Sequence, residues 1–242
     1  MERMLAYQCD ATTLTGFLAD GSRGRDVPGV LVCHEANGLG ERAKQAARQL
    51  ANLGLVAFAM DLYGEAFPIE DTPIHHARLM STPGLMARRA SAALARLTEE
   101  EYVDPERLAA IGFCQGGVVT LELARQQAPI RAAIGFHPAF ARPEGSRDGP
   151  ISAKVLMMVG DADPLVGESD QRRFIKDMTA AGADWQLHIF GGTGHSFTSP
   201  AIDALGLPGF SYDGRAERRA WAAMADCLGE CFGLPSLMGP SA

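Results

Sequence analysis

Short apolar runs alternate with longer stretches of helical periodicity along most of this sequence, and this alternation constrains the fold more than any other feature. The apolar runs predict buried strands at 30–33, 55–60, 108–112, 131–136, 154–159 and 185–190. The periodic stretches predict helices at 41–53, 83–97, 116–125, 169–181 and 215–232. Strands separated by helices form βαβ units, so we expect an α/β fold with a mostly parallel central sheet and helices on both faces. An antiparallel pair at 5–8 and 13–19 would lie at the edge of that sheet.

Length and charge narrow the class of protein. For 242 residues, a single α/β domain spanning 1–242 is the simplest organisation. A formal net charge of −7 argues against a nucleic-acid binder. No apolar run reaches the roughly 18 residues of a membrane-spanning helix, and the first residues lack the apolar core of a signal peptide. We therefore expect a cytoplasmic protein that has neither nucleic acid nor membrane as a partner.

The cysteines and loop histidines do not indicate a metal centre or a disulfide framework. The five cysteines are an odd number, and no two are spaced as Cys-x-x-Cys. Cys227 and Cys231 are four residues apart on a predicted helix without further ligands nearby, so we interpret them as ordinary helix residues. His75 and His76 lack a third ligand at useful spacing and are interpreted as solvated loop residues. We expect no metal and no cofactor.

The stretch Gly112-Phe113-Cys114-Gln115-Gly116 carries the strongest chemical signal. It lies between a predicted strand and a predicted helix, which is the arrangement of the nucleophile elbow of α/β-hydrolases, with cysteine where serine is usual. The two glycines leave room for a turn so sharp that side chains at their positions would collide. The helix that follows would present free N–H groups and positive potential to the sulfur, which favours a thiolate.

A nucleophile of this kind needs a base and an orienting acid, which follow it in the order acid, then histidine. His195 lies in a flexible loop after the last predicted strand, whereas His188 is mid-strand and His137 precedes the plausible acids. We therefore expect His195 to be the base. Asp161 and Asp163 both follow the strand at 154–159, and Asp163 is the better candidate because Asp161 is placed to brace the turn.

The loop after the first parallel strand supplies the remaining candidates. An oxyanion hole in this fold takes one backbone N–H from the residue after the nucleophile and one from this early loop, which nominates Gln115 and Ala36. Glu35 would face the same site and could accept the thiol proton. Tyr63 and Phe113 are expected to wall the substrate pocket. Long loops at 62–81, 138–151 and 191–213 should gather at the same edge of the sheet.

Five motifs stand in order along the chain and together resemble the dienelactone hydrolase family (carboxymethylenebutenolidases). They are His34-Glu35-x-x-Gly38, Asp61-Leu62-Tyr63-Gly64, Gly112-Phe113-Cys114-Gln115-Gly116-Gly117, Gly160-x-x-Asp163-Pro164-Leu165-Val166 and Gly194-His195-Ser196-Phe197. The resemblance implies an α/β-hydrolase with a Cys114–His195–Asp163 triad, and Glu35 as the glutamate that activates the thiol. It also implies hydrolysis of a small-molecule lactone or ester through a cysteine acyl-enzyme, without a cofactor, by a monomer or homodimer.

One departure from the family pattern bears on specificity. The family's prototype lactonases hold a substrate carboxylate with two arginines, at positions that here read Gly64-Glu65 and Thr198-Ser199. Arg78, Arg88 or Arg142 could substitute from a loop. Without such a substitute, we expect a related neutral lactone or ester rather than dienelactone. Two alternatives stay open: an acyl-transfer or thioesterase enzyme on the same triad, and a hydrolase-fold protein that binds a ligand without turnover.

Overall fold

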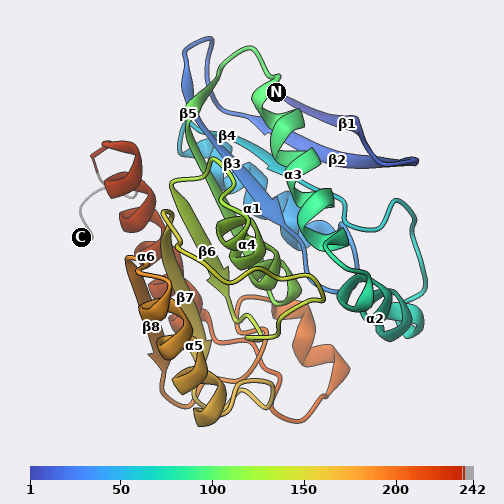
Figure 1. The fold of residues 1–242 in the computed structure, drawn as a ribbon, viewed down its shortest axis with the longest axis vertical. Helices are drawn as coiled ribbons and strands as arrows, with labels where there is room; N and C mark the ends of the chain where they lie inside the picture. Colours follow the sequence, from blue (N-terminus) through green and yellow to red (C-terminus); the bar gives the residue numbers. More distant parts are fainter. Residues whose placement is uncertain (236, 238–242) are drawn as a thin grey trace.

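The computed structural model describes residues 1–235 and 237 and shows a central eight-stranded sheet with helices on both faces (Figure 1). The strand order is β1-β2-β4-β3-β5-β6-β7-β8, in which β2 runs antiparallel to both β1 and β4 and the remaining pairs are parallel. This arrangement confirms the predicted α/β-hydrolase fold. The strands are β1 (Glu2–Cys9), β2 (Thr12–Asp20), β3 (Val27–Cys33), β4 (Val56–Ala59), β5 (Val103–Phe113), β6 (Ala132–Phe136), β7 (Lys154–Gly160) and β8 (Trp185–Phe190).

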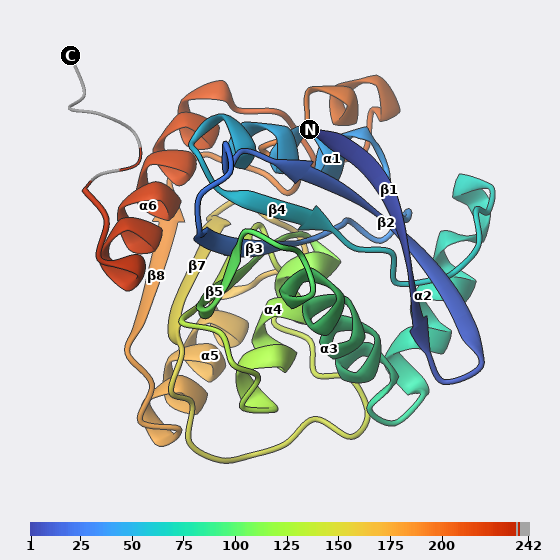
Figure 2. The same cartoon turned by 90° about the horizontal axis from the view of Figure 1, so that it is seen from above.

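The helices cover the sheet in two layers. Figure 2 shows α1 and α6 on one face and α3, α4 and α5 on the other. Successive side chains of a strand point to opposite faces, so Val30 and Val32 pack on the α1/α6 side while Leu31 packs on the α3/α4 side. The helices are α1 (Glu41–Asn52), α2 (Thr72–Ser81), α3 (Leu85–Thr98), α4 (Gln115–Arg125), α5 (Glu168–Ala180) and α6 (Gly214–Phe232), with short 3-10 helices η1 (Ile69–Asp71) and η2 (Pro200–Leu205).

Two elements differ from the sequence-based expectation. The segment expected as a long loop after Tyr63 contains η1 and α2, and α2 buries only Leu79, so it has no apolar stripe that periodicity could reveal. Strand β5 begins at Val103 rather than near 108, because Val103 and Asp104 pair with β3 before a register shift that leaves residues 105–107 unpaired with it. Within the described residues, no helix has the length and apolar character needed to span a bilayer.

The backbone is most tightly packed where β5 turns into α4. A Cβ added at Gly112 would lie 2.1 Å from the carbonyl of Gly116, and one added at Gly116 would lie 2.1 Å from the carbonyl oxygen of Cys33. The first turn of α4 therefore rests directly on the end of β3. This contact places the start of α4 beside the loop that follows β3, at the carboxyl edge of the sheet.

We expect Gly112→Ala to destabilise the fold by roughly 3 kcal/mol or more, because the added methyl group meets backbone that cannot move aside. Urea denaturation would measure the change. Gly191→Ala is the matched control, since a Cβ there meets no atom within 4 Å. Equal stability of the two variants would contradict this account of the turn.

Candidate active site

Cys114 lies at the tip of the turn between β5 and α4 in a strained backbone conformation. Its φ is 52° and its ψ is −115°, a region that costs a non-glycine residue about 1–3 kcal/mol. The strain is held by hydrogen bonds on both sides: the Cys114 N–H donates to Phe136 at 2.9 Å, and the Gly117 N–H donates to the Cys114 carbonyl at 3.0 Å. This geometry leaves the Cys114 side chain partly exposed, at the wall of a cavity.

His195 connects Cys114 to Asp163. Its Nε2 lies 3.2 Å from the sulfur of Cys114, and its Nδ1 lies 2.7 Å from Oδ2 of Asp163. The side chains of His195 and Asp163 are both fully buried. The structure therefore brings together the three side chains that the sequence nominated as nucleophile, base and acid.

Backbone pairing fixes the loop that carries His195. The His195 N–H donates to Gly209 at 2.8 Å, and the His195 carbonyl accepts from Ser211 at 3.2 Å. The other oxygen of Asp163 accepts from the Leu165 N–H at 2.8 Å. Asp161 instead accepts from the Gly192 N–H at 2.5 Å, so it braces the turn, as expected for the second acid. Backbone hydrogen bonds thus fix the loops that carry His195 and Asp163.

The ionisation of His195 is set by its two neighbours. Burial disfavours the charged imidazolium, but the hydrogen bonds to Asp163 and Cys114 outweigh burial and raise the pKa of His195 to about 9. His137 packs edge-on against this ring, and burial followed by the charge of His195 holds the pKa of His137 well below its usual value. A positive charge at neutral pH is therefore assigned to His195, where it can stabilise a thiolate on Cys114.

Glu35 lines the same cavity as Cys114 without a hydrogen bond from the thiol among the described residues. Burial raises the pKa of Glu35, while the charges of Arg42 and His195 oppose that rise. Arg42 was not foreseen from the sequence. Its guanidinium stacks 4.6 Å above the ring of Phe113 and contacts Glu217 of α6 at 3.0 Å. Its buried Nε has no partner among the described residues, so Arg42 keeps a free donor near Glu35.

The two residues nominated as oxyanion donors both line the cavity. Neither the Ala36 nor the Gln115 backbone N–H donates to another group in the described part of the chain. The Tyr63 hydroxyl donates to the Ala36 carbonyl at 2.9 Å and also contacts the Gln115 side chain, so it ties the two residues together. His76 contacts the same Gln115 side chain. A carbonyl oxygen above Cys114 would find both amides free.

Three sequence-based expectations need correction here. Phe113 is fully buried and stacks on Phe136 at 4.9 Å, because its side chain points to the α1/α6 face rather than into the pocket. Tyr63 lies behind Gln115 and is not part of the cavity wall. His76 is a wall residue rather than a solvated one, since α2 turns it toward Gln115, and no sequence pattern indicated that helix.

The cavity has a volume of about 720 Å³, and its walls are mostly apolar. Apart from the reactive groups, large parts of the wall come from Ile69, Val118, Leu165, Ile202, Leu205 and Phe210. Among the described residues, no lysine or arginine lines it. The described residues also contain no group of three or more potential metal ligands. The cavity therefore fits an uncharged organic group.

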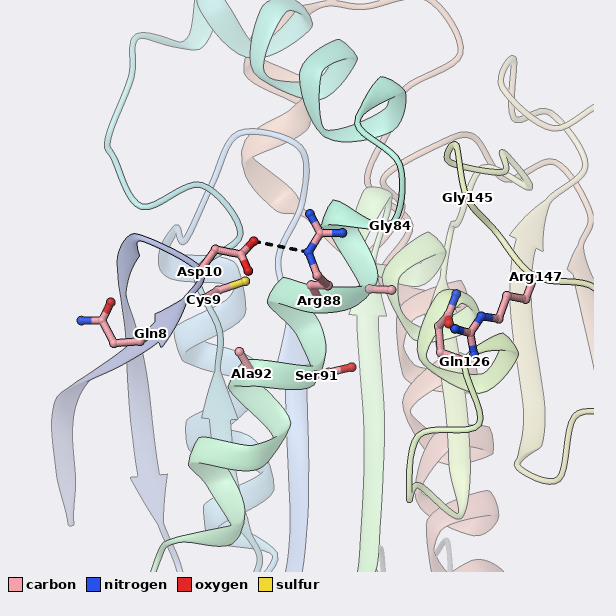
Figure 3. A pocket seen from close by; sticks show the side chains of 11 residues that line it. Gln8, Cys9, Asp10, Gly84, Arg88, Ser91, Ala92, Gln126, Gly145 and Arg147 are labelled. Carbon is pink, nitrogen blue, oxygen red and sulfur yellow. Dashed lines mark hydrogen bonds and ion pairs between the residues drawn. The ribbon is translucent and has the colours of Figure 1, made fainter.

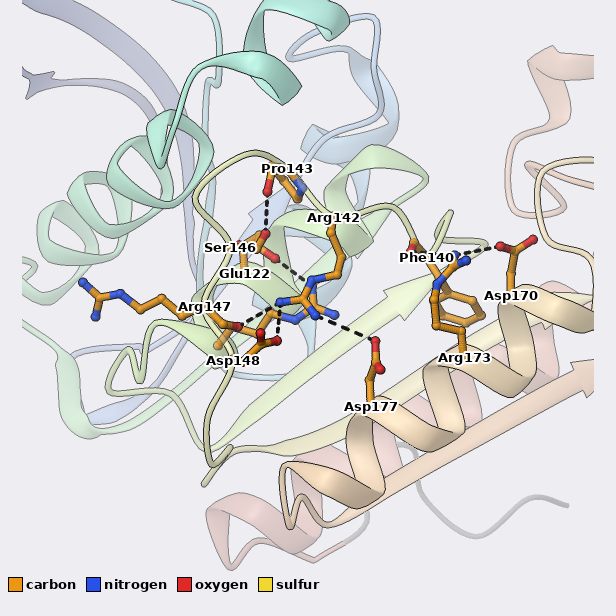
Figure 4. A network of polar contacts seen from close by, with 11 residues as sticks. Glu122, Phe140, Arg142, Pro143, Ser146, Arg147, Asp148, Asp170, Arg173 and Asp177 are labelled. Carbon is orange, nitrogen blue, oxygen red and sulfur yellow. Dashed lines mark hydrogen bonds and ion pairs between the residues drawn. The ribbon is translucent and has the colours of Figure 1, made fainter.

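The arginines that could have replaced the family's carboxylate clamp lie elsewhere. Arg88 pairs with Asp10 at 3.3 Å, beside a groove between the β1–β2 hairpin and α3 (Figure 3). Arg142 pairs with Asp148 at 2.7 Å and lies near Asp177 of α5 (Figure 4). Arg78 borders a separate pocket with Glu65. None of the three substitutes for the missing clamp.

The shifted pKa of His195 makes a prediction about stability. The folded-state pKa of about 9 exceeds the ordinary value of 6.5, so this group contributes stability below pH 6.5 that is lost as the pH rises through 9. The stability difference between wild type and His195→Gln should therefore shrink across that window, by up to roughly 3 kcal/mol. Urea denaturation at each pH measures it. A difference that stays constant from pH 6.5 to 9 would contradict the assigned charge.

Comparisons with known proteins identify the family to which this chain is similar. A dienelactone hydrolase-like promiscuous phosphotriesterase from metagenomic libraries superposes with a TM-score of 0.91 at 36% identity, covering 96% of this chain and 99% of that one. A probable 2-oxo-3-(5-oxofuran-2-ylidene)propanoate lactonase of Bradyrhizobium sp is 28% identical over 74% of this chain and 76% of its own length. A putative carboxymethylenebutenolidase of Aquifex aeolicus is 24% identical over 91% of this chain and 95% of its own length. The model of the dienelactone hydrolase family matches residues 14–232, and the chain therefore belongs to that family.

Proposed function

We propose that this protein hydrolyses small, neutral carboxylic esters or lactones through an acyl-enzyme on Cys114. The observation that carries the proposal is the continuous contact from the Cys114 sulfur through His195 to Asp163, at the wall of a cavity without lysine or arginine among its described residues. Family membership supports a hydrolase. The cavity supplies the reason to favour neutral substrates.

The distances suggest the following sequence of bonds. The Cys114 thiolate attacks the carbonyl carbon, and the oxyanion that forms accepts hydrogen bonds from the Ala36 and Gln115 amides. The imidazolium of His195, 3.2 Å from the sulfur, gives its Nε2 proton to the leaving alkoxide as the carbon–oxygen bond breaks. The neutral imidazole then takes a proton from water, whose oxygen attacks the thioester and releases the acid. Asp163 holds Nδ1–H throughout.

Glu35 is proposed as a second proton acceptor for the thiol. A partly buried carboxyl with a raised pKa takes up a proton more readily than an exposed one, and Arg42 limits how far that pKa rises. The Arg42 guanidinium approaches from behind Phe113 rather than from the cavity. It therefore tunes Glu35 without offering a cation to the substrate.

Two other functions are tested by the same assays. An acyl-transfer or thioesterase activity would use the same triad, and product formation would then depend on an added alcohol, amine or thiol. A non-catalytic ligand binder would retain the cavity without turnover. A neutral phosphotriester, the substrate class named for the metagenomic relative, also suits a cavity whose described residues include no lysine or arginine, and it belongs in the panel.

We expect Cys114→Ala to remove nearly all hydrolysis of activated aryl esters and small lactones, because it removes the atom that is acylated. Stopped-flow assays of the wild type should show a burst of the aryl alcohol. Cys231→Ala, which changes a partly exposed cysteine on α6, is the matched control and should retain activity. If wild type and Cys114→Ala turn over the whole panel equally slowly, the proposal fails.

We expect neutral substrates to be preferred over carboxylated ones. Placing a substrate carboxylate beside Glu35, in a wall whose described residues include no lysine or arginine, gives it no ammonium or guanidinium partner, and the His195 imidazolium is already paired with Asp163. The matched pairs are esters that carry a second carboxyl group away from the bond that is hydrolysed. The form in which that second group is a methyl ester should therefore show a kcat/KM about tenfold or more above that of the form in which it is a free acid. Steady-state kinetics on matched pairs measures this ratio. Faster turnover of the carboxylated members would show that a cation reaches the site.

A further inference from the structure

The cavity wall is divided between two separate segments of the chain. Ile69 and Pro73, from η1 and the start of α2, form one side together with Ala36, whose amide is a proposed oxyanion donor. Ile202 and Leu205, from η2, form another side in the loop that carries His195. In Figure 1, α2 and the orange-red loop that contains η2 both lie at the end of the sheet toward which β6 points. Cys114 lines the same cavity as residues of both segments.

Both sides present large apolar side chains that remain exposed to water. Ile69 is 56% exposed and Leu205 is 51% exposed, although each lines the cavity. Leu165, next to the Asp163 turn, is 47% exposed and lines it as well. Single exposed leucines are ordinary, but a group of them around the mouth of a cavity marks a surface that gains from being covered. An apolar substrate group would cover them.

The direction of proton transfer indicates which side of the cavity receives the leaving group and which side receives the acyl group. This step depends on the proposed function, in which His195 protonates the leaving oxygen. The leaving group must then extend past His195, whose ring contacts Phe210 at 4.9 Å, toward η2. The acyl group leaves the carbonyl carbon in the other direction, past Ala36 and His76, toward η1 and α2.

We propose that the η1–α2 side, with Ile69, is a subsite for an apolar acyl chain, and that the η2 side, with Leu205, is a subsite for an apolar alcohol group. The substrate class is therefore a neutral ester with hydrocarbon on both sides of the carbonyl. Each methylene that leaves water on either side should raise kcat/KM by about two- to fourfold until the subsite is filled.

The test uses two substrate series and two variants. The acyl series is p-nitrophenyl acetate to octanoate, and the alcohol series is methyl to hexyl butyrate. Ile69→Ser should flatten the acyl series and leave the alcohol series unchanged, whereas Leu205→Ser should do the reverse. Because both side chains are half exposed, both variants should fold.

Matched controls come from the same two segments. Ile74→Ser on α2 and Leu207→Ser after η2 remove exposed apolar side chains that do not line the cavity, and should leave both series as in the wild type. Flat series in the wild type, or equal flattening of both series by either variant, would overturn the two-subsite assignment. Failure of the proposed function would look different, because acetate hydrolysis would then persist in Cys114→Ala.

Discussion

The close packing of the first turn of α4 against the end of β3 is the constraint on which the rest of the site depends. Gly116 leaves no room for a side chain above the Cys33 carbonyl, so the two backbones meet directly. Cys33 is followed by His34, Glu35 and Ala36, whereas Gly116 is preceded by Cys114 and Gln115. One backbone contact therefore brings together the segments that carry the sulfur, both proposed oxyanion donors and the partly buried carboxyl of Glu35.

The charged side chains near this contact act on the reacting groups of the protein rather than on a charged group of the substrate. Asp163 and the Cys114 sulfur together favour the imidazolium of His195 against the cost of its burial. Arg42 does not line the cavity, but its charge opposes the rise in the pKa of Glu35, and it is held by Glu217 and by the ring of Phe113. Among the described residues, the cavity wall contains no lysine or arginine, and the cavity is apolar at its mouth. These two features distinguish this site from one built to hold a carboxylate.

The sequence predicted the fold and the sharp turn at Cys114 because those features are local. Alternating apolar runs revealed the parallel strands, and paired glycines around Cys114 identified the turn at the end of β5. The aromatic residues were harder to place. Phe113 directly precedes the nucleophile. Because side chains alternate along β5, its ring nevertheless packs on the α1/α6 face of the sheet and not in the cavity.

The missed residues depend on contacts between distant elements. In the sequence, Arg42 is indistinguishable from an ordinary polar residue of a surface helix. Its contacts with Phe113 and Glu217 form only because α1 and α6 pack beside β5. His76 reaches Gln115 because α2 forms where the sequence indicates a loop. Neither contact leaves a periodic or motif signal, because each is set by how elements far apart in the chain meet.

The most direct measurement of the central claim is intact-protein and peptide mass spectrometry of the enzyme quenched during turnover of an activated ester. The account predicts one acyl group per chain, carried by the peptide that contains Cys114, with Cys9, Cys33, Cys227 and Cys231 unmodified. Product release without any adduct, or an adduct on another cysteine in place of Cys114, would contradict it.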